Sequence, residues 1–199
     1  MTINWTPPPP RRGLAGAWDR FIGPGARDAE LWLQLLPTLA APLLLLLYAR
    51  QHSLGWSGWQ QAVAALLAFD LVGGVITNAT ATAKRWYHRP GQGFAAHFGF
   101  VAVHFLHPLL VAWLFRGGDW AYFAASYLYL LLAAAAILAL PLYLQRPAAL
   151  ACAVGGLALS LYAFTPTPGL EWFLPVFYLK LLVSHLLKEA PFAPPSSAG

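Results

Sequence analysis

The sequence predicts an all-α integral membrane protein, built as a six-helix transmembrane bundle. Three observations favour this fold class. Only 10% of the 199 residues are charged and 59% are hydrophobic, whereas soluble domains carry about 25% charged residues. Six apolar runs each approach the roughly 20 residues that a helix needs to cross the hydrocarbon core. Tryptophan and tyrosine gather near the ends of these runs, as interfacial anchors do.

The first 28 residues are predicted to form a cytoplasmic tail. Four prolines at positions 7–10 favour a stiff, extended lead-in. The tail lacks the basic segment followed at once by an apolar one that marks a secretory signal. Residues 13–21 fit a helix on the membrane surface, with Trp18 and Phe21 toward lipid and Arg20 toward headgroups. A loosely ordered tail is the alternative.

Six spans make up the predicted transmembrane domain, residues 29–188. Breaks that contain Gly, Pro and charged residues separate the spans, which cover residues 30–48, 59–80, 94–115, 120–143, 148–165 and 171–188. Prolines inside these runs predict helix kinks at Pro37 and Pro42, at Pro108 and at Pro175. Residues 189–199 form the predicted flexible C-terminal tail.

Basic residues predict the orientation. With six spans, both tails, the second loop and the fourth loop share one side of the membrane. That side holds nine Lys and Arg residues, and the other holds only Arg50 and Arg116; the nine are Arg11, Arg12, Arg20, Arg27, Lys84, Arg85, Arg89, Arg146 and Lys188. Because Lys and Arg concentrate in cytoplasmic loops, we expect both termini in the cytoplasm, with the protein in a bacterial inner membrane.

The net charge of +5 follows from this orientation. Outside the spans there is no basic fold large enough to hold nucleic acid, so nucleic-acid binding is not indicated. We expect membrane lipid as the partner and leave open self-association into a homo-oligomer. The single cysteine, Cys152, excludes a disulfide within the chain.

Polar groups within the spans are the candidate functional residues, because ionisable side chains in lipid are costly and usually functional. They come from the second, third and sixth spans: Asp70, Thr77, Asn78, His97, His104, His107, Lys180, Ser184 and His185. From a helical rise of about 1.5 Å per residue, Asp70, His104, His107 and Lys180 fall near the bilayer centre. We expect the three helices to line a polar cavity that opens to the cytoplasm.

Two local features support this cavity. Pro108 has no N–H to donate to the carbonyl of His104, and a free carbonyl in hydrocarbon needs a partner from protein, water or a ligand. Gly73 and Gly74 lie beside Asp70 and remove side-chain bulk, so that another helix or a ligand can come close.

A metal centre is the first interpretation of the histidines. His104 and His107 are three residues apart, hence on one helix face, and Asp70 can complete a His/carboxylate set for Zn, Fe or Mn. His97 or His185 would add a further ligand. The alternative is a set of histidines that hydrogen-bond to backbone and to one another. Haem held by His97 and His185 is a third option, although the usual spacing of paired histidines along each helix is missing.

Charged residues suggest two further roles. Asp70 and Lys180 are predicted to form an ion pair in the membrane. The loop residues Lys84, Arg85 and Arg89, above Asn78, are either a topology determinant or a clamp for an anionic headgroup.

Three functional hypotheses follow from these residues. The first is a metal-dependent enzyme acting on a lipid-like substrate, with Asp70, His104, His107 and Lys180 as catalytic residues. The second is a proton-coupled transporter or channel subunit that uses Asp70, the histidines and Lys180 as a relay. The third is an accessory membrane protein whose polar groups hold the helices together.

Overall fold

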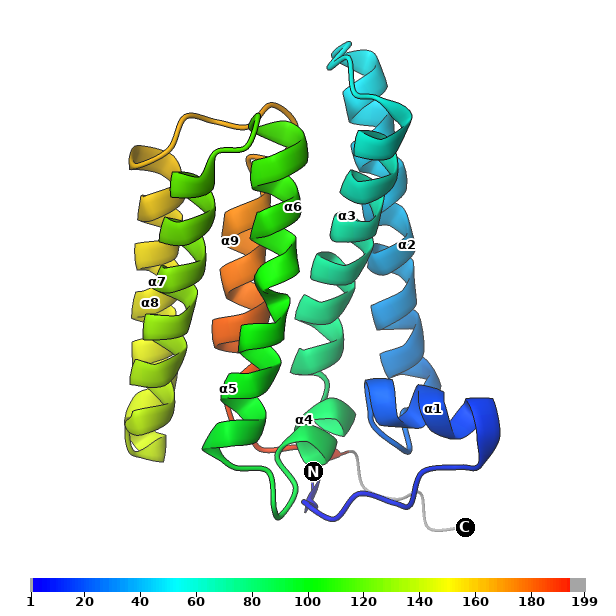
Figure 1. The fold of residues 1–199 in the computed structure, drawn as a ribbon. Helices are drawn as coiled ribbons and strands as arrows, with labels where there is room; N and C mark the ends of the chain where they lie inside the picture. The colour runs from blue at the N-terminus through cyan, green and yellow to red at the C-terminus, as the bar shows by residue number, and fades with distance from the viewer. Residues whose placement is uncertain (1, 194–199) are drawn as a thin grey trace.

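The computed structural model describes residues 2–193, and this part of the chain is helical almost throughout (Figure 1). Within it, five helical segments are long and apolar enough to cross a membrane: Asp28–Gln51 (α2), Gly58–Ala79 (α3), Phe94–Phe115 (α5, η1 and α6), Trp120–Ala139 (α7) and Leu142–Tyr162 (α8). The sixth apolar helix, Phe173–His185, is shorter than the predicted span 171–188. These helices support a helical membrane protein.

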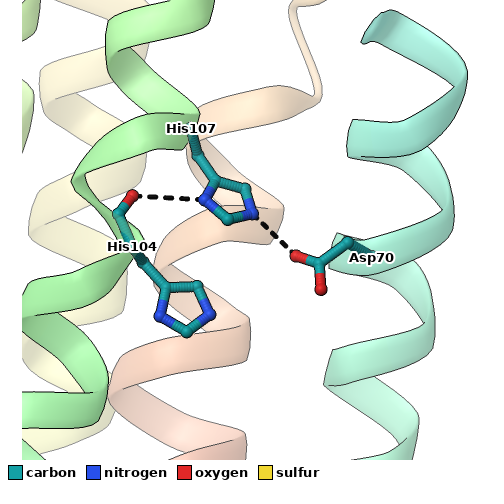
Figure 2. Close-up of side chains that lie close together, drawn as sticks. All are labelled: Asp70, His104 and His107. Carbon is teal, nitrogen blue, oxygen red and sulfur yellow. Dashed lines mark hydrogen bonds and ion pairs between the residues drawn. The ribbon is translucent and has the colours of Figure 1, made fainter. Parts of the chain in front are cut away.

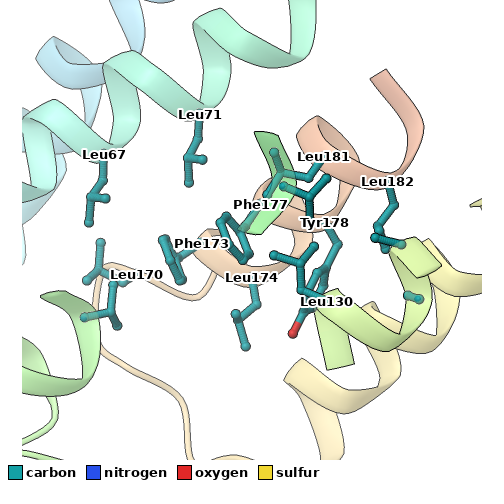
Figure 3. Packing of buried hydrophobic residues seen from close by; sticks show 14 of the residues in the cluster. Leu67, Leu71, Leu130, Leu170, Phe173, Leu174, Phe177, Tyr178, Leu181 and Leu182 are labelled. Carbon is teal, nitrogen blue, oxygen red and sulfur yellow. The ribbon is translucent and has the colours of Figure 1, made fainter. Parts of the chain in front are cut away.

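The sixth helix occupies the centre of the bundle. It consists of an α-helical part, Phe173–Tyr178 (α9), followed by a π-helical part, Leu179–His185 (η2), and it contacts α3, α7 and α8. Phe173 and Phe177 are fully buried, together with Leu71 of α3 and Leu130 of α7 (Figure 3). Neighbouring helices therefore cover this short helix. Its π-helical turn is a rare conformation, found frequently at functional sites.

The third helical segment is interrupted where Pro108 predicts a break. It consists of Phe94–Ala102 (α5), a 3₁₀ turn at Val103–Phe105 (η1) and Leu106–Phe115 (α6). Pro108 lies in the first turn of α6, where a missing N–H costs little. The regular α-helix is thus interrupted next to His104, while the kink predicted at Pro108 stays a prediction. By contrast, α2 continues as one helix through Pro37 and Pro42.

The boundary between the fourth and fifth helices was predicted wrongly. α7 ends at Ala139 and α8 begins at Leu142, so the break expected at residues 144–147 lies inside α8. The physical cause is Pro141, because a residue before proline is kept out of the helical region. Leu140 is accordingly extended, with φ −81° and ψ 151°.

Side-chain caps begin two of the helices at one end of the bundle. Ser57 Oγ accepts from the N–H of Gln60, whose side chain accepts in turn from the N–H of Ser57, a capping box that starts α3. Asp119 Oδ1 accepts from the N–H of Tyr122 at the start of α7 and Oδ2 pairs with Arg116. These contacts supply partners for backbone groups that a helix end leaves free.

The two described ends of the chain meet at the opposite end of the bundle. Thr2–Ile3 (β1) pairs antiparallel with Phe192–Ala193 (β2), beside the short helices Gly13–Ile22 (α1) and Ala81–Tyr87 (α4) (Figure 1). Helix α1 exposes Leu14, Trp18 and Phe21, and its position on a membrane surface stays a prediction. Of the predicted C-terminal tail, residues 194–199 lie outside the described part.

Candidate functional site

Three potential metal ligands converge between α3 and the interrupted third segment. Asp70 of α3, His104 of η1 and His107 of α6 each offer a ligand atom, and these atoms all lie within 4.8 Å of one another (Figure 2). His107 Nε2 is 2.7 Å from Asp70 Oδ2. The structure therefore brings together three of the four residues that the sequence placed at one depth.

The backbone around the break orients His104. Its Nδ1 lies 2.6 Å from the carbonyl oxygen of Phe100, and a carbonyl only accepts hydrogen bonds. Nδ1 therefore carries the proton, which leaves the lone pair on Nε2. This arrangement, with one ring nitrogen bonded to a carbonyl and the other left free, is common for metal-binding histidines.

His107 faces a carboxylate and a carbonyl at once. Its Nδ1 lies 3.2 Å from the carbonyl oxygen of His104, the one that Pro108 cannot pair. Its Nε2 lies 2.7 Å from Asp70 Oδ2, and a carboxylate oxygen only accepts hydrogen bonds. Nε2 therefore donates to Asp70 in this contact. For Nε2 to bind a metal, it would have to give up this hydrogen bond.

Lys180 forms the predicted ion pair with Asp70. Its Nζ lies 2.5 Å from Asp70 Oδ2, and its side chain is only 4% exposed. Gly74 permits this approach, because a Cβ at Gly74 would overlap the Lys180 side chain. The Asp70 side chain is 43% exposed, and no described residue hydrogen-bonds to its second oxygen, Oδ1. Oδ2 of Asp70 is thus bound to Lys180 and His107, whereas Oδ1 has no hydrogen bond from a described residue.

A cavity of about 250 Å³ lies beside this cluster. Its walls come from α1, α2, α3, α4, α5, η1 and η2. Its polar lining residues are Gln34, Thr38, Asp70, Thr77, Asn78, Tyr87, His104 and Lys180. The sequence predicted walls from the second, third and sixth spans. The additional contribution of α2 was missed; its available signal was Gln34 and Thr38, four residues apart and hence on one face.

Helix α1 forms part of the cavity wall at the end of the bundle that holds the chain ends. Trp18, Phe21 and Ile22 of α1 line it there. The opening of the cavity to the cytoplasm stays a prediction. Phe69, on another wall, is 45% exposed, so part of the rim is apolar and faces outward.

His97 and His185 lie in a separate cluster. His97 Nδ1 is 3.4 Å from His185 Nε2, and the ring of His88 stacks on His97. The ring of Phe100 stacks on His185 and also contacts His104, so it separates this cluster from the Asp70 group. At 3.4 Å the two histidine nitrogens are in direct contact, and a haem plane does not fit between them.

Lys84 binds the C-terminal end of the sixth helix. Its Nζ donates to the carbonyl oxygens of Ser184 and Leu187, at 2.6 Å each. The side chain is only 2% exposed, and Glu189 lies 3.6 Å away. Burial lowers the pKa of Lys84 to about 8. This lysine therefore satisfies carbonyls that the last helical turn leaves free, and it does not face the cavity.

The other loop cations also point elsewhere. Arg85 lines a different pocket, formed with the N-terminal segment. Arg89 lies over the Trp86 ring, 3.8 Å from its centroid, and donates to the Trp86 carbonyl. Of the four residues predicted to hold a headgroup, Asn78 alone is among those that line the cavity.

The chain was also compared with known proteins. No protein-family model matches it, and neither a curated protein nor a solved structure matches it. The functional argument therefore depends on the side-chain geometry.

Proposed function

We propose that the protein is a membrane-embedded, metal-dependent enzyme that acts on a lipid-like substrate. The observation that carries this proposal is the convergence of Asp70, His104 and His107 within 4.8 Å beside a cavity between helices. Two histidines and one carboxylate form a donor set used by zinc hydrolases and by non-haem iron(II) oxygenases. Three protein ligands leave further positions for water or substrate.

The surrounding contacts suit such a centre. Asp70 Oδ1 and the Nε2 atoms of the two histidines would bind the metal, while Lys180 stays on Asp70 Oδ2. The carbonyl of Phe100 accepts the Nδ1 proton of His104. The carbonyl of His104, 3.2 Å from His107 Nδ1, would accept a proton from that atom when Nε2 binds a metal, and such an outer shell fixes the ligand orientation. A metal at this position would activate a bound water or polarise a substrate oxygen.

We also propose six crossings, with both termini in the cytoplasm of a bacterial inner membrane. The distribution of basic residues, nine against two, supports this orientation. The pairing of β1 with β2 at one end of the bundle supports an even number of crossings. Membrane lipid is then the surrounding partner. The exposed leucines of α2, among them Leu39, Leu43 and Leu47, would face lipid or a second copy of the chain.

The enzyme proposal is tested with purified protein in liposomes made from a bacterial lipid extract. Zn, Fe(II) or Mn is added, and products are followed by mass spectrometry. We expect new lipid products with one of these metals, and a loss of at least 100-fold in His104→Ala. His52→Ala removes an exposed loop histidine and serves as the matched control. Equal turnover by His104→Ala, or none with any metal, would contradict the proposal.

A second candidate function, proton-coupled transport, is favoured by a different observation. Titratable side chains contact one another within two groups: His88, His97 and His185 near α4, and His107, Asp70 and Lys180 between the helices. The Phe100 ring lies between the two groups, so a relay through both would need water beside this ring. A metal-free protein that carries protons across vesicles, and loses this flux in His185→Phe, would favour this function over the enzyme.

A further inference from the structure

The side chain of Asn78 presents a carboxamide to the cavity. Asn78 is only 6% exposed and lines the cavity wall. None of the described residues forms a hydrogen bond with this carboxamide, which can make up to four. The amide atoms of Asn78 are not sealed inside the protein but reach the cavity, where water or a ligand can supply their partners. The cavity therefore has a polar end that calls for an occupant able to donate and accept hydrogen bonds.

The charge of the cavity decides what that occupant is. Lys180 is the only Lys or Arg among the lining residues, and its ammonium is already paired with Asp70. Lys84 is held by two carbonyls, and Arg89 lies over Trp86. A phosphate at the Asn78 end of the cavity, away from the Asp70 cluster, would be desolvated without a free counter-ion, which is unfavourable. Other lining residues with hydroxyl and amide groups are Thr77, Thr38 and Gln34.

The position of Asn78 on α3 indicates how a ligand would lie in the cavity. Asn78 and Asp70 are eight residues apart on α3, which is roughly 12 Å along the helix axis. Apolar side chains of Leu35, Phe69 and Phe100 also line the cavity. A molecule that reaches from Asn78 to Asp70 is therefore polar at one end and apolar along its body, as an amphiphile is.

We infer that the cavity binds an uncharged amphiphile, a lipid whose polar end carries hydroxyl or amide groups and no phosphate. Asn78 holds this end by hydrogen bonds, and the apolar chain packs along the wall formed by Leu35, Phe69 and Phe100. The inference rests on the proposed function, because it takes the cavity as the substrate site. It replaces the anionic headgroup that the loop cations had suggested.

The test compares two lipids that share one acyl chain. Wild-type protein in detergent is titrated with monooleoylglycerol, which is uncharged, and with oleoyl-lysophosphatidic acid, which has a phosphate in place of one hydroxyl. Binding is measured by native mass spectrometry. We expect monooleoylglycerol to bind at least tenfold more tightly. Equal affinity, or a preference for the phosphate, would overturn the inference.

A variant assigns this preference to Asn78. In Asn78→Leu the affinity for monooleoylglycerol should fall about tenfold, since one hydrogen-bonding group is removed. Gln61→Leu, which alters an exposed amide on the same helix, should leave it unchanged. Unaltered binding by Asn78→Leu would mean that the lipid is held elsewhere, which also contradicts the inference.

The experiment also separates this inference from the enzyme proposal, because binding is measured without metal. If the preference is present in a protein that binds no metal, the inference holds and the enzyme proposal fails. If metal and turnover are present but lysophosphatidic acid binds equally well, the inference alone fails.

Discussion

Asp70 joins three helical segments through a single carboxylate. Oδ2 receives both Lys180 of η2 and His107 of α6. Burying an isolated charge is expensive, whereas a hydrogen-bonded pair offsets much of that cost. The Asp70–Lys180 ion pair therefore connects the sixth helix to α3. It also fixes the orientation of the Asp70 carboxylate, whose Oδ1 stays open for a metal.

Gly74 leaves space for the Asp70–Lys180 ion pair, and its substitution is predicted to lower the stability of the protein. In Gly74→Ala the new methyl group overlaps the Lys180 side chain, so the lysine must move away from Asp70. We expect a loss of about 1–3 kcal/mol in stability, as is usual for overpacking, seen as a lower melting temperature in detergent. Gly99→Ala is the control: no atom lies within 4 Å of its added Cβ, so it should be neutral or slightly stabilising. Equal effects of the two substitutions would contradict this role of Gly74.

Lys84 anchors the end of the sixth helix, and its burial predicts a pH dependence. The folded protein holds the pKa of Lys84 at about 8, whereas an unfolded lysine titrates near 10.4. Between these values the unfolded chain binds more protons, so the contribution of Lys84 to the free energy of unfolding rises with pH. Below pH 8 both states are protonated and this contribution is constant.

This dependence is measured as the melting temperature from pH 7.5 to 10. In Lys84→Met the melting temperature should rise less with pH than it does in the wild type. Lys188→Met, at an exposed lysine, should keep the wild-type slope. If Lys84→Met and wild type show parallel profiles, the buried ammonium does not titrate as the structure indicates.

The sequence predicts the helices better than their contacts. Hydropathy locates the spans, because each must be apolar over its full length. Depth along a helix follows from residue number, so Asp70, His104 and His107 could be placed together. The separation of His97 and His185 from this group could not be predicted, because it depends on where the ring of Phe100 packs.

Two further features depend on backbone turns that the residue pattern does not determine. Thr80 is extended, with ψ 147°, and this turn directs Lys84 inward to η2. The π-helical register of residues 179–185 sets the direction of Lys180. In both cases tertiary packing decides which way a cation points, and the sequence alone indicates only that the cation is present.

Across the whole molecule, the six proposed crossings would place the loops on alternating sides of the membrane. The structure allows a direct test after Cys152, the one native cysteine, is changed to Ala. Pro166→Cys, exposed after α8, should react with a membrane-impermeant maleimide on intact cells. Pro90→Cys, exposed after α4, should react only after lysis. The reverse pattern would contradict the orientation, and labelling of both on intact cells would contradict six crossings.

Metal content tests the central proposal most directly. Detergent-purified wild type, His104→Ala and the control His52→Ala would be measured by plasma mass spectrometry after equilibration with Zn, Fe(II) or Mn. The geometry of Asp70, His104 and His107 predicts about one metal ion per chain in wild type and in His52→Ala, and loss of that ion in His104→Ala. A wild type that retains no metal, or a His104→Ala that retains as much as wild type, would contradict the metal centre.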